Sequence, residues 1–340
     1  MNADPILTIA WLVLAHLTAD FILQTGAMVA AKSSSGWRAV RGLLAHAFGV
    51  GVCLVPVVLA FGSAGMWVLV VITVTHVIID RTKVLVTRRA ERRALAAAQR
   101  RHEGRAQAAG LGRGWTPLPA AYFALDQAAH LAIIGIAWAI WLAGQAPTPF
   151  WAATVDEVIP GRDPAAVHDV VLGVVVLASL LIANARAGAM FVATLVRPIE
   201  AAIEFGSRGS APSDSTPEAA EAGRPRPAGW SFRIGPLAGR VVADPPPAPA
   251  DTAGVAGERV ALPPPAQVGA TIGVLERLLI VTFMLAGADA AIGFVVGAKT
   301  LARFRLLDDR DFAEYYLLGT LASVGVAIVT AIVARAALGT

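Results

Sequence analysis

The stretch PILTIAWLVLAHLTADFILQ, residues 5–24, is long and apolar enough to cross a lipid bilayer as one helix, since such a span needs about 20 mostly apolar residues. The whole sequence has the same character. Of its 340 residues, 56% are hydrophobic and 15% are charged, and the mean hydropathy is +0.64. A soluble domain carries about 25% charged residues. We therefore expect an all-α, polytopic membrane protein with five to seven transmembrane helices.

Further hydrophobic segments follow the first one along the chain. The predicted spans are residues 5–24, about 40–61, 66–86, 118–142 and 170–196, and a hydrophobic block follows from residue 268. Residues 205–267 hold twelve of the 21 prolines, and such a segment buries too little apolar surface to offset the entropy of ordering it. The sequence thus predicts four parts: a four-helix membrane domain over 1–145, an outer loop and fifth helix over 146–204, a disordered cytoplasmic linker over 205–267, and a C-terminal membrane block over 268–340.

Basic residues are distributed unevenly among the predicted loops. Lys32, Arg38 and Arg41 follow the first span, and eight arginines follow the third, where residues 88–107 are predicted to continue it as a basic helix. Cytoplasmic loops carry the excess of Lys and Arg, so we expect these loops inside and the N-terminus outside, in a multi-pass protein of the bacterial inner (cytoplasmic) membrane. The basic run lacks interleaved aromatic residues, so nucleic-acid binding is not expected.

Histidine and aspartate recur at matched depth in the first four spans. Three spans carry a His/Asp pair spaced i, i+4, which places both side chains on one helix face. The pairs lie in HLTAD (16–20), HVIID (76–80) and DQAAH (126–130), and the second span adds the histidine of LLAHA (43–47). In the predicted orientation, each aspartate lies nearer the cytoplasmic face than its histidine. The set is His16, Asp20, His46, His76, Asp80, Asp126 and His130.

Polar groups that are so costly to hold in hydrocarbon are expected to face inward and to be paired, protonated or bound to metal. Imidazole and carboxylate suit divalent Zn, Mn or Fe, and the helices of a bundle can bring such ligands to one point. Seven candidates exceed the four ligands of a tetrahedral ion, which indicates two ions, or one ion with supporting residues and a base. A proton or ion relay and a structural hydrogen-bond network are the other interpretations.

A polar rim lies on the cytoplasmic side of this set. Gln24 and Arg81, together with Lys32 and Lys83, are placed to hold the anionic headgroup of a lipid or a lipid-linked phosphate. Arg81 and Lys83 also fit a plain role as markers of the helix end. Asp20 and Asp80 are the candidates for a catalytic base, because water enters from this side.

The segments HLTADFILQ, LLAHA, THVIIDRTK and LDQAAH, in this order and spacing, resemble the bacterial inner-membrane family known as domain of unknown function 3307, over about residues 5–145. They are also similar, more loosely, to a wider group of membrane-bound proteins described as metal-dependent hydrolases, which share intramembrane His/Asp motifs. The first resemblance implies a membrane location and a polar motif set, without an established reaction.

The C-terminal block is predicted to contain a helical hairpin. A single span over residues 272–304 would leave Lys299 and Arg303 outside, against the charge rule. A break at Gly287 would form a re-entrant hairpin and return the basic end to the cytoplasm. We expect Glu276 and Arg277 to pair with polar neighbours at the membrane surface.

The function most consistent with these patterns is that of a membrane-embedded, metal-dependent hydrolase whose site opens toward the cytoplasmic leaflet. A transporter of divalent cations or protons is the main alternative, and a non-catalytic assembly or sensor subunit is a third. The outer halves of the first four spans show no second polar layer, which argues against transport.

Overall fold

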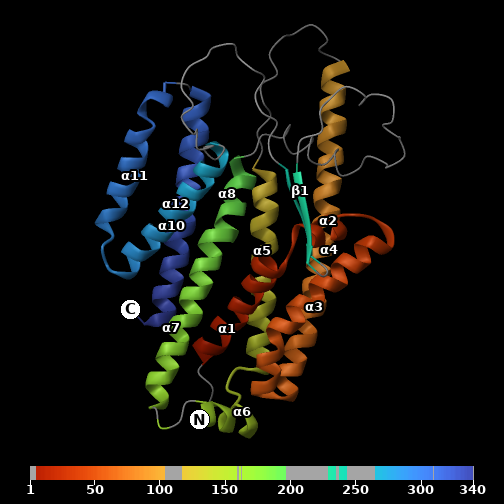
Figure 1. Cartoon of the computed structure of the whole chain (residues 1–340), viewed down its shortest axis with the longest axis vertical. Helices are drawn as coiled ribbons and strands as arrows, with labels where there is room; N and C mark the ends of the chain where they lie inside the picture. Colours follow the sequence, from red (N-terminus) through yellow and green to blue (C-terminus); the bar gives the residue numbers. More distant parts are fainter. Residues whose placement is uncertain are drawn as a thin grey trace. The chain divides into compact units, whose positions relative to one another are not determined.

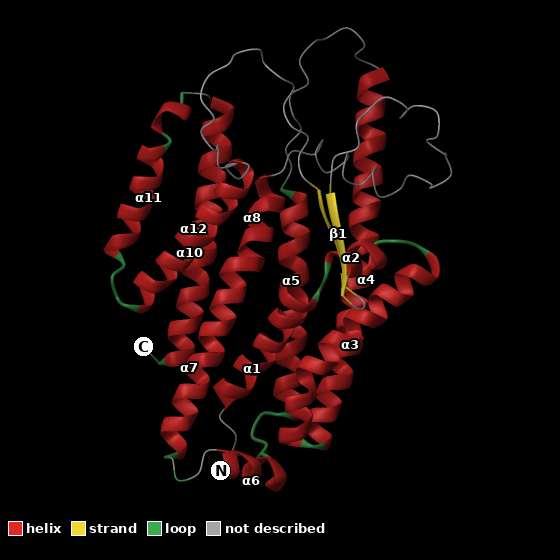
Figure 2. Cartoon of the chain, in the orientation of Figure 1, coloured by secondary structure: helices red, strands yellow, loops and turns green. Residues whose placement is uncertain are grey.

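In a computed structural model, helices make up nearly all of the described part of the chain (Figures 1 and 2). The structure describes residues 5–103, 117–158, 161, 163–196, 229–234, 237–242, 265–308 and 310–339. The chain divides into two compact units, one formed by Met1–Gly209 with Pro265–Thr340 and the other by Ser210–Pro264. Six helices of the described part are long and apolar enough to cross a membrane, which confirms the predicted polytopic α-helical class.

The first four predicted spans are all helical. The first helix, α1 (Pro5–Thr18), continues into a π-helical turn, η1 (Ala19–Leu23). It is followed by α3 (Gly36–Phe61), α4 (Ser63–Glu103) and α5 (Leu118–Trp141). α4 extends well beyond its predicted span, as expected for the basic helix predicted after it. Residues 104–116 of the next loop lie outside the described residues.

A tight turn at Gly62 joins α3 to α4. The φ angle of Gly62 is +57°, a conformation that glycine adopts without steric cost. Close to the turn, a Cβ atom on Gly65 would overlap the carbonyl oxygen of Val57. The two helices therefore pack with their backbones in contact beside the turn, and this arrangement brings His46 of α3 and His76 of α4 to a similar depth.

Two short helices were not predicted: α2 (Gly26–Lys32) in the first loop and α6 (Pro149–Val158) after α5. Thr25 begins α2, because its Oγ1 accepts a hydrogen bond of 3.2 Å from the backbone nitrogen of Met28. α2 lies so close to α3 that a Cβ on Gly42 would be 2.6 Å from the backbone nitrogen of Lys32. This packing carries Lys32 into the bundle, where it is buried.

The predicted fifth span is present as α7 (Pro164–Ile182), a second π-helical turn, η2 (Ala183–Ala187), and α8 (Gly188–Val196). The C-terminal block consists of α10 (Pro265–Leu285), α11 (Ala290–Ala302), a 3-10 turn, η3 (Phe304–Leu306), and α12 (Arg310–Leu338). An apolar core joins α7 to α10 and α12, with Leu180, Ile280 and Ala327 among its members.

The helical hairpin predicted at Gly287 is present. Gly287 has a φ of +70° and lies in the turn between α10 and α11, which run in opposite directions (Figure 1). Glu276 of α10 forms an ion pair with Lys299 of α11. Arg277 also pairs with a polar neighbour: it is 2% exposed and donates from Nε to the backbone oxygen of Asn184, 2.7 Å away in η2. Its expected position at the membrane surface stays a prediction.

A small β-hairpin lies within the segment that was predicted to be a disordered linker. β1 (Gly229–Ile234) pairs antiparallel with β2 (Leu237–Val242), with Gly229 opposite Val242 and Ile234 opposite Leu237. Twelve paired residues therefore have regular structure where composition predicted none. The prediction for the remaining residues up to 264 lies outside the described residues.

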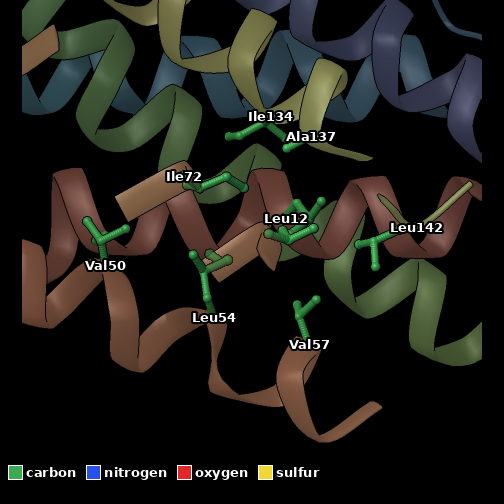
Figure 3. Close-up of a cluster of buried hydrophobic side chains, with 11 residues drawn as sticks. Leu12, Val50, Leu54, Val57, Ile72, Ile134, Ala137 and Leu142 are labelled. Atoms are coloured by element: carbon green, nitrogen blue, oxygen red, sulfur yellow. The ribbon is translucent and has the colours of Figure 1, made fainter. Parts of the chain in front are cut away.

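An apolar core fills the bundle of α1, α3, α4 and α5 on the side of the Gly62 turn (Figure 3). On each helix, a member of this core lies one helical turn from a histidine, on the side of the Gly62 turn. Leu12 precedes His16 by four residues, Ile72 precedes His76 by four, and Val50 and Ile134 follow His46 and His130 by four. The same helix faces are thus apolar toward the turn and polar toward the opposite end.

Candidate metal centre

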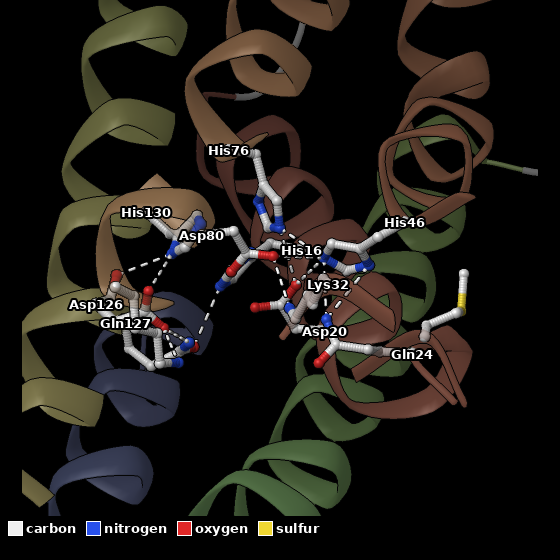
Figure 4. A network of polar contacts seen from close by, with 12 residues as sticks. His16, Asp20, Gln24, Lys32, His46, His76, Asp80, Asp126, Gln127 and His130 are labelled. Carbon is white, nitrogen blue, oxygen red and sulfur yellow. Dashed lines mark hydrogen bonds and ion pairs between the residues drawn. The ribbon is translucent and has the colours of Figure 1, made fainter. Parts of the chain in front are cut away.

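The seven histidine and aspartate side chains predicted from the sequence lie together between α1 with η1, α3, α4 and α5 (Figure 4). The four histidines are each at most 4% exposed. Their rings contact one another. The ring centroids of His76 and His130 are 4.1 Å apart, and those of His16 and His130 are 4.9 Å apart. The fold therefore converts four separate sequence motifs into one buried cluster.

The most crowded atom of the cluster is Nε2 of His46. It lies 2.9 Å from Nε2 of His76, 3.2 Å from Oδ1 of Asp20 and 3.4 Å from Oδ2 of Asp80. Nε2 of His76 is in turn 3.0 Å from the same Asp20 oxygen. An imidazole nitrogen either donates one hydrogen or accepts one, so hydrogen bonds cannot account for all of these contacts at once.

Asp20 reaches this point from the π-helical turn η1. Such widened turns occur frequently at functional sites. The turn begins at Ala19, between His16 and Asp20, so this pair does not lie wholly within a regular α-helix. The other two pairs, on α4 and α5, lie in regular α-helical segments. The i, i+4 spacing predicted the shared face, but it did not predict the distortion.

A second branch of the cluster surrounds His130. Nδ1 of His130 lies 2.8 Å from the backbone oxygen of Asp126, and because a carbonyl only accepts, this nitrogen carries the hydrogen. Nε2 of His130 is buried and has no hydrogen-bond partner within the described part of the chain. Gln127, which the sequence analysis missed, lies 3.2 Å from His16 Nε2 through its side-chain oxygen and donates to Asp126 Oδ2 at 3.2 Å. Its position three residues before His130, on the same helix face, was the signal that could have found it.

Two lysines hold two of the three aspartates. Lys32 donates to Asp80 Oδ2 at 2.7 Å, and Lys83 donates to Asp126 Oδ2 at 2.6 Å. The Lys32 side chain is 10% exposed, whereas that of Lys83 is 34% exposed. The sequence placed both lysines in a rim outside the cluster. The structure draws Lys32 inward because α2 folds against α3.

The two residues predicted to orient a substrate lie in different surroundings. The side-chain nitrogen of Gln24 is 3.1 Å from Nε2 of His46, so Gln24 contacts the cluster directly. Arg81 follows Asp80 on α4, and its Nη1 is buried without a hydrogen-bond partner among the described residues. Their role toward a substrate stays a prediction.

Three groups of side chains have ligand atoms within 4.8 Å of one another and could each hold a metal ion. They are His16, Asp20 and His76; His46, His76 and Asp80; and Asp80, Asp126 and His130. His76 belongs to two of the groups, and Asp80 also belongs to two. The donor set of imidazoles and carboxylates fits a divalent transition metal. The groups are contiguous, so they form one centre with shared ligands.

The fold and this cluster define a polytopic α-helical membrane protein that encloses a His/Asp centre between its first four spans. Residues 7–159, a little under half of the chain, match the family model described as "Protein of unknown function (DUF3307)". The match confirms the resemblance predicted for about residues 5–145 and extends it through α6. No curated protein and no solved structure matches the chain. The looser resemblance to metal-dependent hydrolases stays a prediction.

Proposed function

We propose that this protein is a membrane-embedded hydrolase that depends on a divalent transition metal bound by the His/Asp cluster. The spacing of four ligand atoms carries the proposal: Nε2 of His46 and of His76, Oδ1 of Asp20 and Oδ2 of Asp80. The distances given above among these atoms are 2.9, 3.0, 3.2 and 3.4 Å. With metal–ligand distances of about 2.0–2.1 Å, the ligand atoms of a tetrahedral zinc ion lie about 3.3 Å apart.

A cation also accounts for the excess of contacts at His46. One ion accepts a lone pair from each of several ligands at once, which a hydrogen atom cannot do. Unlike Asp80, Asp20 contacts histidines and no lysine or arginine among the described residues, and a divalent ion would neutralise its charge where unpaired charge is costly. Zn, Mn and Fe are the metals whose ligand preferences fit this donor set.

The chemistry of hydrolysis divides between the metal and the protein. A bound divalent ion lowers the pKa of a coordinated water to about 7 and polarises a substrate oxygen. Asp20 and Asp80 are the candidates for the base that removes the proton of the water. Asp20 contacts both His46 and His76 through Oδ1 alone, so its second oxygen is the one that would accept the proton.

The basic groups on the opposite side from the apolar core favour an anionic substrate. Lys32 and Lys83 lie against Asp80 and Asp126, and Arg81, the residue after Asp80, has a buried guanidinium nitrogen without a hydrogen-bond partner in the described chain. Ammonium and guanidinium groups bind phosphate oxygens strongly. By the charge rule this is the cytoplasmic side. We therefore place a lipid-linked or other phosphate-bearing substrate at the cytoplasmic leaflet.

Transport of divalent cations or protons is the second candidate, because the cluster connects buried histidines to the partly exposed Lys83. The apolar core beyond the histidines weighs against it. Leu12, Val50, Ile72 and Ile134 occupy the next positions on the same helix faces, so an apolar layer follows the histidines toward the Gly62 turn. Hydrolysis needs access from one side only.

Metal content tests the first part of the proposal. Protein purified without added metal should contain a divalent transition metal by elemental analysis, and His76→Ala should lose it. His168→Ala is the matched control, because His168 lies at the start of α7, outside the cluster, and should retain the wild-type content. Metal-free wild-type protein that also fails to bind added Zn²⁺, Mn²⁺ or Fe²⁺ would disprove the metal centre.

Activity tests the second part. Hydrolysis should be screened on lipid phosphates with the metal-loaded protein in detergent. Of Asp20→Asn and Asp80→Asn, the one that removes the base should lose at least about 100-fold in rate, which is a typical contribution of acid–base catalysis, and this loss should persist when the variant is reloaded with metal. Metal-dependent ion flux in proteoliposomes, without hydrolysis of any substrate, would favour transport instead.

A further inference from the structure

We propose that the cluster binds two divalent cations, the second one between Asp80, Asp126 and His130, with Asp80 shared between the two positions. This inference rests on the proposed metal centre and adds the number of ions and their separate ligands. The ligand atoms of the three residues lie within 4.8 Å of one another, and all three residues are at most 6% exposed. In Figure 4, His130 and Asp126 lie on the far side of Asp80 from His46.

The hydrogen on Nδ1 of His130 leaves its Nε2 free to act as a ligand at this position. Its Nδ1 donates to the backbone oxygen of Asp126 at 2.8 Å, so in the neutral ring Nε2 keeps a lone pair. That atom is buried and has no hydrogen-bond partner in the described part of the chain. Backbone hydrogen bonds of this kind fix the tautomer and orientation of histidines that ligate metals. A buried imidazole lone pair without a donor is otherwise a loss of free energy.

Asp126 supplies a second ligand with an uncommitted atom. Its Oδ2 accepts from Lys83 and Gln127, whereas its Oδ1 is buried and lacks a hydrogen bond within the described residues. Asp80 belongs to both the group with His46 and the group with His130. A carboxylate with two oxygens can bridge two ions, and paired metals in hydrolytic enzymes lie about 3.5–4 Å apart.

Lys83 occupies the place of a competing cation. Its ammonium group is 2.6 Å from Asp126 and its side chain is 34% exposed, so it can move outward when a metal ion neutralises Asp126. Removal of this ammonium should therefore strengthen binding of the second ion. A purely structural ion pair predicts no such gain, which makes the lysine variant a direct test of the site.

The experiment is a titration of metal-free protein with Mn²⁺ in detergent, read by elemental analysis and by electron paramagnetic resonance. The wild-type protein should bind two ions per chain and give the spectrum of a coupled pair. His130→Ala and the nearly isosteric Asp126→Asn should each bind one ion and give the spectrum of an isolated Mn²⁺. Lys83→Met should bind the second ion about tenfold more tightly, equivalent to about 1.4 kcal/mol. His168→Ala should match the wild type.

The outcomes separate the two proposals. One ion in the wild type, retained in His130→Ala but lost in His76→Ala, would overturn the second position and leave the proposed function standing. Two ions in both His130→Ala and Asp126→Asn would show that these residues are not ligands, and would also overturn it. If the wild type binds no ion, the metal centre and the second position both fail. A folded, monodisperse Asp126→Asn variant keeps the test valid if His130→Ala does not fold.

Discussion

The charges nearest the cluster differ in how deeply the fold buries them. Asp80 and Lys32 are both largely buried, whereas Lys83 keeps about a third of its side chain exposed. A buried ion pair that loses one partner leaves an uncompensated charge in a medium of low dielectric constant. The same loss near a surface is softened by solvent. The two lysines should therefore respond differently to the same substitution.

Lys32→Met should lower the free energy of unfolding of the metal-free protein by about 3 kcal/mol, because Asp80 loses its partner. Lys83→Met should cost about 1 kcal/mol or less, because the Lys83 pair is partly exposed. Chemical denaturation in detergent with a chelator present measures both. The double variant Lys32→Met with Asp80→Asn should recover part of the loss. Equal costs for the two single variants would contradict the difference in burial.

Among the described residues, Arg277 is buried like Lys32, and we expect it to stabilise the fold. Its Nε donates to the Asn184 backbone oxygen at 2.7 Å and its Nη1 to Ser323 Oγ at 3.0 Å. A lysine presents one ammonium and cannot reproduce this fork. Arg277→Lys should lower the free energy of unfolding by about 2 kcal/mol.

Ser323→Ala is the control for Arg277, since it removes one acceptor and keeps the guanidinium. It should cost about 1 kcal/mol. Thermal unfolding followed by circular dichroism compares the two. If the Ser323→Ala protein is less stable than the Arg277→Lys protein, the hydroxyl of Ser323 contributes more to stability than the guanidinium of Arg277, and the prediction is wrong.

At the scale of elements, the α3–α4 hairpin aligns two of the four histidines, and it depends on a close backbone approach. A Cβ on Gly65 would overlap the Val57 carbonyl, whereas a Cβ on Gly49 of α3 would meet nothing within 4 Å. Gly65→Ala should therefore destabilise the protein by about 1–3 kcal/mol through overpacking. Gly49→Ala should leave stability unchanged or raise it by up to about 1 kcal/mol, because alanine loses less entropy in a helix. Chemical denaturation should show a lower unfolding midpoint for Gly65→Ala than for the wild type, and an unchanged or higher midpoint for Gly49→Ala.

The short helix α2 shows how an element outside the predicted spans completes the centre. Its last residue is Lys32, whose side chain donates to Asp80. The sequence shows Thr25 as a helix-starting residue and Lys32 as a basic residue, but it does not show that the helix turns back onto Gly42. That contact is a property of the packed pair of helices.

At the scale of the whole molecule, the arginine asymmetry predicts the orientation in the membrane. In a protein without Cys53, single cysteines at Ser34, Gly104 and Ser213 should react only with reagents that enter the cytoplasm, and a cysteine at Gly144 should react from outside. Labelling of intact cells with an impermeant maleimide measures this. External labelling at Ser34 or Gly104 would reverse the orientation and place the proposed site at the other leaflet.

The sequence by itself determined the class of the protein and the membership of the cluster. Apolar runs of membrane-spanning length predicted the helices, because hydrocarbon allows few other structures. The i, i+4 pairs on three spans predicted which side chains share a face, because the helical period is fixed. The hairpin at Gly287 followed from the charge rule and from the conformational freedom of glycine. Each of these inferences rests on local periodicity or on composition.

Only the tertiary structure decided how the groups meet. Three contacts show this, and each joins residues far apart in the sequence. His46 contacts Asp80, Lys32 donates to Asp80, and buried Arg277 donates to the backbone of Asn184. The π-helical turn that carries Asp20 has no marker in the sequence, since its residues also suit an α-helix. Such features depend on the distances between packed helices, and a linear pattern carries no information about those distances.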